Sequence, residues 1–291
     1  MTVLQEAPAP IRAQQTLAAI RSLLVHVEPG VDAQPRLAAA ADLARKLDAT
    51  LIGVGAEMIQ SLGVADPFGV LGSAWVVELQ QLVVDNLKHA EAVFRAKTAG
   101  LETQWLALET LPGPALARLS RGADLIVAGG APLTFKDAYR VADTAELVLL
   151  SGRPVLVVPP EGGKFRGEAV VVAWKDTRES RRAVADAMPL LRAAEDVVVQ
   201  EICDRDASAD AEAHTFAVAE HLKRHGVTAR AKVTIGSADD AADDLKATAR
   251  QLDADLIVAG GYGHSRLGEW VFGGVTRSLL QEPQGYVLLS H

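Results

Sequence analysis

One octapeptide occurs twice in this chain, and it constrains the fold more than any other feature. Residues 123–130 and 254–261 both read Ala-Asp-Leu-Ile-Val-Ala-Gly-Gly, and each copy lies late in its half of the sequence. Each copy is followed by a helix-like segment and then by a terminal apolar run, at 154–158 in one half and 286–289 in the other. Such self-similarity predicts two similar units in tandem. The stretch 159–164 contains two prolines and two glycines and is the expected linker.

Short apolar runs alternate with amphipathic segments in both halves. Strands are expected at 22–27, 50–54, 101–108, 124–128, 154–158, 169–174, 196–202, 227–233, 254–259 and 286–289. Helices are expected at 32–47, 74–98, 114–121, 138–150, 178–193, 208–225 and 238–252, and one more is expected to begin near Gly274. Because strands that alternate with helices form parallel βαβ crossovers, the expected fold class is α/β. It would comprise two tandem doubly wound open parallel-sheet domains, at residues 1–160 and 167–291.

Composition narrows the class of protein. Hydrophobic residues make up 49% of the chain and the formal net charge is −8, which indicates a globular protein without a broad nucleic-acid-binding or membrane-binding surface. The single cysteine, Cys203, makes no intrachain disulfide and is expected to be a small packed residue. Residues 1–13 lack the features of a secretory signal, and no apolar run reaches membrane-spanning length, so a cytoplasmic location is expected.

A glycine-rich stretch follows the second copy of the repeat. Gly260-Gly261-Tyr262-Gly263 ends the predicted strand, nine residues intervene, and Gly273-Gly274-Val275-Thr276 opens the predicted helix. Glycine lets a backbone approach a phosphate closely, and a helix N-terminus offers unpaired N–H groups. The stretch therefore predicts a phosphate site. The alternative is that glycine is simply common where a strand turns into a helix.

The spacing resembles the G-2x-G-9x-G-(S/T) signature of universal stress proteins that bind ATP. Gly260, Gly263 and Gly273 match its glycines, and Gly274 stands at its Ser/Thr position. The two-half layout, over nearly all of the chain, is similar to the tandem members of that family. The resemblance implies an adenine nucleotide alpha hydrolase-like fold, a stress-response regulatory role, and ATP or a related adenine nucleotide, with or without Mg²⁺. It also implies that the two final strands pair about a pseudo-twofold axis.

Several residues are candidates for contact with phosphate. Arg266, inside the loop, is placed to clamp a phosphate group, or else it belongs to a solvated loop tip. Gly274 and Val275 belong to the start of the helix, where backbone N–H groups are expected to face the ligand. Thr276 either donates to a phosphate oxygen or supports the turn.

The other end of the ligand would meet the residues that follow the first strand of the second half. The family's acidic position there aligns with Lys175, so Asp176 either replaces that acid or caps the helix beginning at Arg178. Trp174 either stacks on a base or packs in the core. By the resemblance, Ile202 would line the adenine pocket, a role that is compatible with that of a core residue.

The first half has lost the glycine loop. Pro132 stands where the second motif glycine would be, and it lacks an N–H group to donate. No glycine follows at the spacing of the third motif glycine. The first half is therefore not expected to hold a nucleotide in the family manner, and its expected role is structural or regulatory.

Other functional classes find little support. The chain has no P-loop, dinucleotide-binding, nucleophile-elbow or His-Glu-x-x-His motif. No catalytic residue is assigned, and any ATP turnover should be slow because no general base is evident beside the phosphates. Two alternatives stay open: a scaffold with a relic loop, favoured by Gly274 and Lys175, and a small-molecule or lipid binder that uses residues 58–75. The expected partners are an adenine nucleotide and an unidentified protein, and the chain is expected to be an intramolecular pseudo-dimer or a homodimer of such units.

Overall fold

The structure, a computed structural model, describes residues 20–31, 34–59, 73–129, 138–237, 239–261, 263–264, 270–271 and 274–291. The strands of the first half are β1 (Ser22–His26), β2 (Thr50–Ala56), β3 (Thr103–Leu108), β4 (Leu125–Gly129) and β5 (Val155–Val158). Those of the second half are β6 (Ala169–Ala173), β7 (Asp196–Cys203), β8 (Ala229–Ile235), β9 (Leu256–Gly260) and β12 (Tyr286–Ser290). Two short strands, β10 (Gly263–His264) and β11 (Trp270–Val271), lie in the glycine loop.

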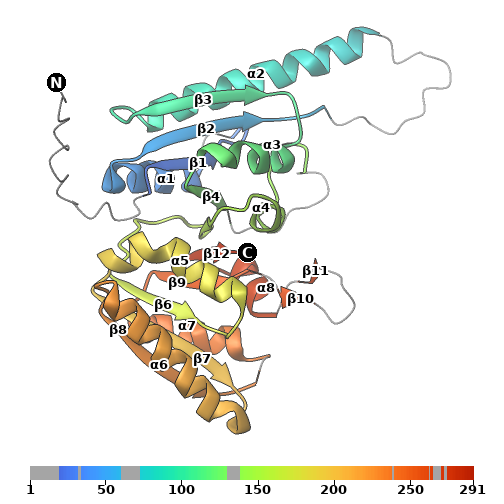
Figure 1. The fold of residues 1–291 in the computed structure, drawn as a ribbon. Helices are drawn as coiled ribbons and strands as arrows, with labels where there is room; N and C mark the ends of the chain where they lie inside the picture. Colours follow the sequence, from blue (N-terminus) through green and yellow to red (C-terminus); the bar gives the residue numbers. More distant parts are fainter. Residues whose placement is uncertain are drawn as a thin grey trace, which may run out of the picture.

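The helices connect these strands in the expected alternation. They are α1 (Pro35–Leu47), α2 (Ser73–Lys97), α3 (Pro112–Leu119), α4 (Thr144–Leu150), α5 (Arg178–Ala193), α6 (Ser208–Arg224), α7 (Ala241–Gln251) and α8 (Gly274–Gln281). The strands β1–β9 and β12 form a single ten-stranded sheet in the order β3-β2-β1-β4-β5-β12-β9-β6-β7-β8. The doubly wound α/β class that the sequence predicts is therefore confirmed, with both halves contributing to one continuous sheet (Figure 1).

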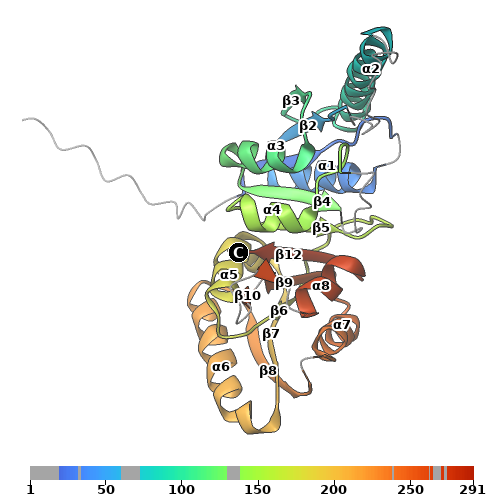
Figure 2. The ribbon, with the colours of Figure 1, turned by 90° about the vertical axis from the view of Figure 1, so that its right-hand side faces the viewer.

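The two halves meet through their last strands. β5 pairs with β12 in antiparallel register, with Val157 opposite Val287 and Leu156 opposite Leu288, whereas the other neighbours in this sheet are parallel. Figures 1 and 2 show the first half stacked on the second with β12 along the junction. The expected pairing of the two final strands is confirmed, and it covers two apolar edges that would otherwise be open.

Two hydrophobic layers sandwich the sheet, and each runs through both halves. One layer contains residues of α1, α2, α5 and α6, and the other contains residues of α3, α4, α7 and α8. Parallel strands buried on both faces are expected to be apolar throughout, which explains the nearly unbroken Val, Leu and Ile runs of β1, β4, β6 and β9.

The strand order reverses at an equivalent point in each half, and a doubly wound sheet is expected to have its crevice there. In the first half the chain runs outward through β1, β2 and β3 and then returns to β4, which lies on the other side of β1. In the second half it runs through β6, β7 and β8 and returns to β9, on the other side of β6. In open α/β sheets, ligands bind outside the carboxyl ends of the strands at such a reversal. A ligand site is therefore expected at the β6–β9 reversal.

α1 and α4 begin later than the sequence predicts, and the cap of α6 precedes its first residue. α4 begins at Thr144 instead of at residue 138, because the Asp143 carboxylate accepts a hydrogen bond from the Ala145 N–H and caps the helix there. α6 begins at Ser208, but this residue does not cap it, since its hydroxyl donates to the Arg205 carbonyl at 2.8 Å. α1 begins at Pro35 instead of at residue 32, and Gln34 is its cap residue.

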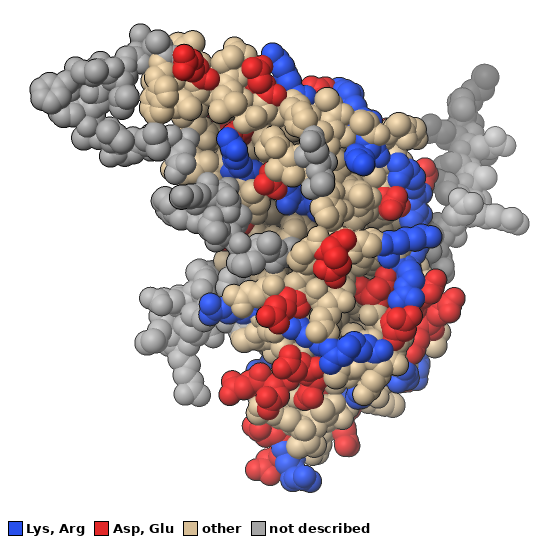
Figure 3. Space-filling model, turned by 180° about the vertical axis from the view of Figure 1, so that it is seen from behind, with Lys and Arg blue, Asp and Glu red and all other residues tan. Residues whose placement is uncertain are grey.

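The surface carries charges of both signs. On the face in Figure 3, Lys and Arg side chains are interspersed with Asp and Glu side chains, and basic groups form no large separate patch among the described residues. Within the described part of the chain, no helix is both long and apolar enough to cross a membrane.

Candidate functional site

The candidate residues gather at the carboxyl ends of β6, β7 and β9. Gly260 ends β9, and its neighbour across the crevice is the start of α5. A Cβ atom added to Gly260 would lie 2.7 Å from the Ser180 nitrogen and 2.9 Å from the Glu179 Cβ. The backbones of β9 and α5 therefore approach each other so closely that no side chain fits at this position.

The first turn of α8 lies against the same strand end. Thr276 is buried, and its hydroxyl lies 3.4 Å from the Gly260 carbonyl oxygen, so it supports the turn. Gly274, the first helical residue, is exposed, and a Cβ atom there would meet nothing within 4 Å. Val275 is half-buried and packs against the second hydrophobic layer. Thr276 and Val275 thus pack the start of α8 against the protein, whereas Gly274 is exposed.

The start of α5 is capped differently from the expectation. Thr177 is the cap residue, and its hydroxyl accepts a hydrogen bond from the Ser180 N–H at 3.3 Å. The alternative that Asp176 caps this helix is therefore wrong. Asp176 instead forms an ion pair with Arg181 at 2.9 Å and remains half-exposed at the edge of the crevice. Thr177 is one residue closer to the helix, where a hydroxyl reaches the third N–H without strain.

A buried carboxylate lies beside Gly260. Burial alone would raise the pKa of Glu179, but hydrogen bonds from Arg178, the backbone and Thr177 outweigh it and lower the pKa below its ordinary value. The Arg178 Nε lies 2.5 Å from Glu179 Oε1. Lys175 and Arg178 are exposed, so they offer positive charge at the solvent side of this crevice.

The residues expected at the base-binding end are mostly packed. Trp174 is 8% exposed and belongs to the first hydrophobic layer, as the packing alternative predicts. Ile202 is half-buried near the end of β7 and packs against the second layer.

Sequence reasoning missed a pair of ionisable side chains next to Ile202. Glu201 Oε2 lies 3.5 Å from His214 Nδ1 on α6. Burial raises the pKa of the Glu201 carboxyl, and the charge of His214 opposes this rise. The available signal was an acidic residue that follows the apolar run 197–199 within β7, because a half-buried acid needs a partner.

Part of the glycine loop is described and part is not. Gly263 belongs to β10 and pairs with Val271 of β11 in antiparallel register. Arg266 and Gly273 lie outside the described residues. Among the described residues, no three His, Cys, Asp or Glu side chains gather as metal ligands would.

The first half shows which residues lie at the equivalent strand ends there. Strand register makes Gly129 the counterpart of Gly260 and Glu28 the counterpart of Lys175, since Val25 pairs with Val127 as Val172 pairs with Val258.

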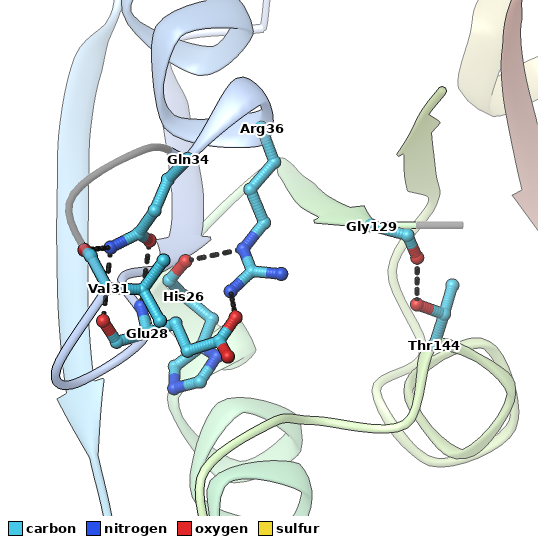
Figure 4. Close-up of polar contacts among 7 residues, drawn as sticks. All are labelled: His26, Glu28, Val31, Gln34, Arg36, Gly129 and Thr144. Carbon is cyan, nitrogen blue, oxygen red and sulfur yellow. Dashed lines mark hydrogen bonds and ion pairs between the residues drawn. The ribbon is translucent and has the colours of Figure 1, made fainter. Parts of the chain in front are cut away.

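The Arg36 guanidinium lies at the strand ends of the first half, where it contacts His26 and Glu28 (Figure 4). Its Nε donates to the His26 carbonyl at 3.0 Å, and its Nη2 donates to Glu28 Oε2 at 2.8 Å. A Cβ atom on Gly129 would lie 3.3 Å from its Nη1. The guanidinium therefore lies between the ends of β1 and β4.

Polar groups at the start of α4 are also hydrogen-bonded within the protein. The Thr144 hydroxyl donates to the Gly129 carbonyl at 2.5 Å, and the Asp143 carboxylate accepts from the Ala145 N–H. The carboxylate places negative charge where a phosphate would have to bind. These contacts are consistent with the expectation that the first half holds no nucleotide in the family manner. The loop change on which that expectation was based, at Pro132, lies outside the described residues.

Strand order, crevice and glycine-rich connection together define a doubly wound α/β protein built from two like units. The model of the universal stress protein family matches residues 168–291. The second half of the chain therefore belongs to the universal stress protein family.

Solved structures extend the likeness to the whole chain. A universal stress protein from Archaeoglobus fulgidus is 15% identical, with a TM-score of 0.63, over 92% of this chain and 95% of that chain. A protein of unknown function from Pseudomonas aeruginosa is 20% identical, with a TM-score of 0.56, over 94% of this chain and 92% of that chain. None of the curated proteins matches this sequence. At these identities the likeness shows the fold, including both halves.

Proposed function

We propose that the second half binds ATP or a related adenine nucleotide, with the phosphates held by the backbone of the β9–α8 connection. The observation that carries this proposal is the close approach at Gly260, together with the open first turn of α8 at the same crevice. Both features lie at the β6–β9 reversal of strand order, where ligands of doubly wound sheets bind.

The chemistry of these groups suits a polyanion. The first turn of α8 presents N–H groups that have no partner within their own helix, and the helix dipole adds partial positive charge. Gly274 leaves that turn uncovered, so a phosphate oxygen can approach the backbone. Lys175 adds a positive charge on the solvent side. Any Mg²⁺ would bind together with the phosphates of the nucleotide.

The first half has a different role in this proposal. Because Arg36 lies at its strand ends and Asp143 caps α4, it does not bind nucleotide and serves as a structural or regulatory unit. Nucleotide binding in the second half changes a surface that a protein partner recognises. The protein acts as a stress-response regulator, and any hydrolysis is slow.

The loop substitution Gly263→Asp tests the phosphate site. The aspartate brings a negative charge into the phosphate path, so ATP affinity measured by isothermal titration calorimetry should fall by at least about tenfold, which corresponds to roughly 1.4 kcal/mol. Gly122→Asp is the matched control, because Gly122 lies in the first half and a Cβ atom there meets nothing within 4 Å. If Gly263→Asp binds ATP as tightly as the unaltered protein, the site assignment is wrong.

Native mass spectrometry of the gently purified protein identifies the ligand. A mass increase that corresponds to an adenine nucleotide supports the proposal. An unliganded protein that also fails to bind added ATP would favour the scaffold with a relic loop. An apolar ligand would favour the small-molecule or lipid binder.

A further inference from the structure

The glycine loop of the second half begins at Gly261, and this residue touches the first half of the chain. A Cβ atom added to Gly261 would lie 2.6 Å from the Val148 Cγ1 on α4. Val148 is only 1% exposed and belongs to the hydrophobic layer that both halves share. We infer that the first half fixes the starting point of the nucleotide loop through Val148, so that the site of the second half is complete only with the first half in place.

The remaining contacts of Gly261 hold it against the same junction. Its N–H donates to the Ser290 carbonyl at 2.7 Å, and its carbonyl oxygen lies 3.1 Å from the His291 Nδ1. Ser290 ends β12, the strand that pairs with β5 of the first half. Gly261 is therefore fixed on one side by β12 and on the other by α4.

Glycine is needed at this position because of its neighbour. The φ angle of Gly261 lies outside the left-handed region, so an L-residue can adopt its backbone conformation without strain. A side chain is excluded only because Val148 occupies the space where its Cβ atom would lie. Any larger residue would push the chain away from α4, and the displacement would pass to Gly263 and the rest of the loop.

α4 is well suited to act as a fixed support. Its first residue, Thr144, donates to the Gly129 carbonyl at the end of β4, and its Asp143 cap fixes where the helix begins. Leu147, the neighbour of Val148, is 1% exposed. The contacts of Thr144 and Asp143 therefore hold the helix on which Gly261 rests.

A compensating pair of substitutions tests this inference, which rests on the proposed nucleotide site. Gly261→Ala should weaken ATP binding by about tenfold, since overpacking a close contact displaces the backbone. Val148→Ala removes the Cγ1 that supports Gly261 and should by itself weaken ATP binding by about threefold or more. The double variant should regain an affinity within about threefold of the unaltered protein. Gly122→Ala and Leu150→Ala are the matched controls, because the first has open space and the second is a solvent-exposed residue of α4.

Thermal melting of the same variants separates this inference from the proposed function. Gly261→Ala should lower the melting temperature, and adding Val148→Ala should restore part of the loss, whether or not the protein binds ATP. Additive losses in melting temperature would overturn the contact itself. Unchanged ATP affinity in Gly261→Ala, or no recovery in the double variant, would overturn the coupling to the site. An unaltered protein that binds no ATP would refute the proposed function, and the coupling to a nucleotide site would fall with it, while the melting data would still decide the contact.

Discussion

His26 is a buried histidine at the end of β1, next to the ion pair of Arg36 and Glu28 (Figure 4). Burial and then the charge of Arg36 lower its pKa from 6.5 to about 3, and the backbone of Ala56 opposes them without outweighing them. The ring is therefore neutral at physiological pH and remains so in mild acid.

This pKa makes stability depend on pH. Because the folded pKa lies below the unfolded value of 6.5, the unfolded chain binds more protons in mild acid, and stability falls as pH falls from 6.5 toward 3. At pH 5 the loss from this residue should be about 2 kcal/mol. His26→Leu should remove that loss, so its urea midpoint should change less between pH 7.5 and pH 5 than that of the unaltered protein. His89→Gln, on the exposed face of α2, is the control, and equal pH dependence in all three proteins would contradict the prediction.

At the scale of elements, β2 shows how a strand accommodates large rings. A Cβ atom on Gly53 would lie 2.6 Å from the Phe94 ring, and one on Gly55 would lie 2.9 Å from the Trp105 ring. The two rings contact each other with centroids 5.3 Å apart. The glycines thus let the aromatic side chains of α2 and β3 lie directly on the backbone of β2.

Gly53→Ala should destabilise the protein by about 1–3 kcal/mol, the typical cost of overpacking a core. Phe94 is fully buried, so its ring cannot move aside into solvent. Equilibrium urea unfolding measures the change, and Gly122→Ala provides the same substitution where space is open. An unchanged midpoint in Gly53→Ala would mean that the ring and strand do not meet as described.

At the scale of the whole molecule, the two halves share one sheet and two hydrophobic layers. Leu156 of β5 and Leu288 of β12 are opposite each other and are both buried in the first layer. Neither half can bury its last strand alone. The chain should therefore unfold as one cooperative unit.

Leu156→Ala tests this cooperativity. Truncation of a buried leucine should cost about 2–5 kcal/mol. Hydrogen exchange at increasing urea concentrations should show β1 and β6 losing protection together, and the substitution should move both transitions to lower urea by the same amount. Continued protection of β6 after β1 has exchanged would show that the halves unfold independently.

Much of the fold follows from local patterns. The repeated octapeptide marks β4 and β9, and the apolar runs at 155–158 and 286–290 are the paired final strands. These patterns are readable because a strand buried on both faces must be apolar along its length. The same logic brought Gly260, Trp174 and Ile202 to the carboxyl edge of one sheet, as expected.

Contacts between side chains of different elements could not be predicted from the sequence. The sequence analysis offered Asp176 as the cap of α5, and the geometry of the first turn chose Thr177 instead. Two prolines and two acids near the start of α1 gave no sign that Arg36 would lie beside Gly129.

What the sequence by itself determined is therefore the list of strands and helices, their alternation and the division into two like units, because each depends on the periodicity of a single segment. Only the tertiary structure decided that Arg36 lies beside Gly129 in the first half, and that Val148 of the first half touches Gly261 of the second. Such contacts join residues far apart in the chain, and their geometry depends on how the whole sheet is assembled.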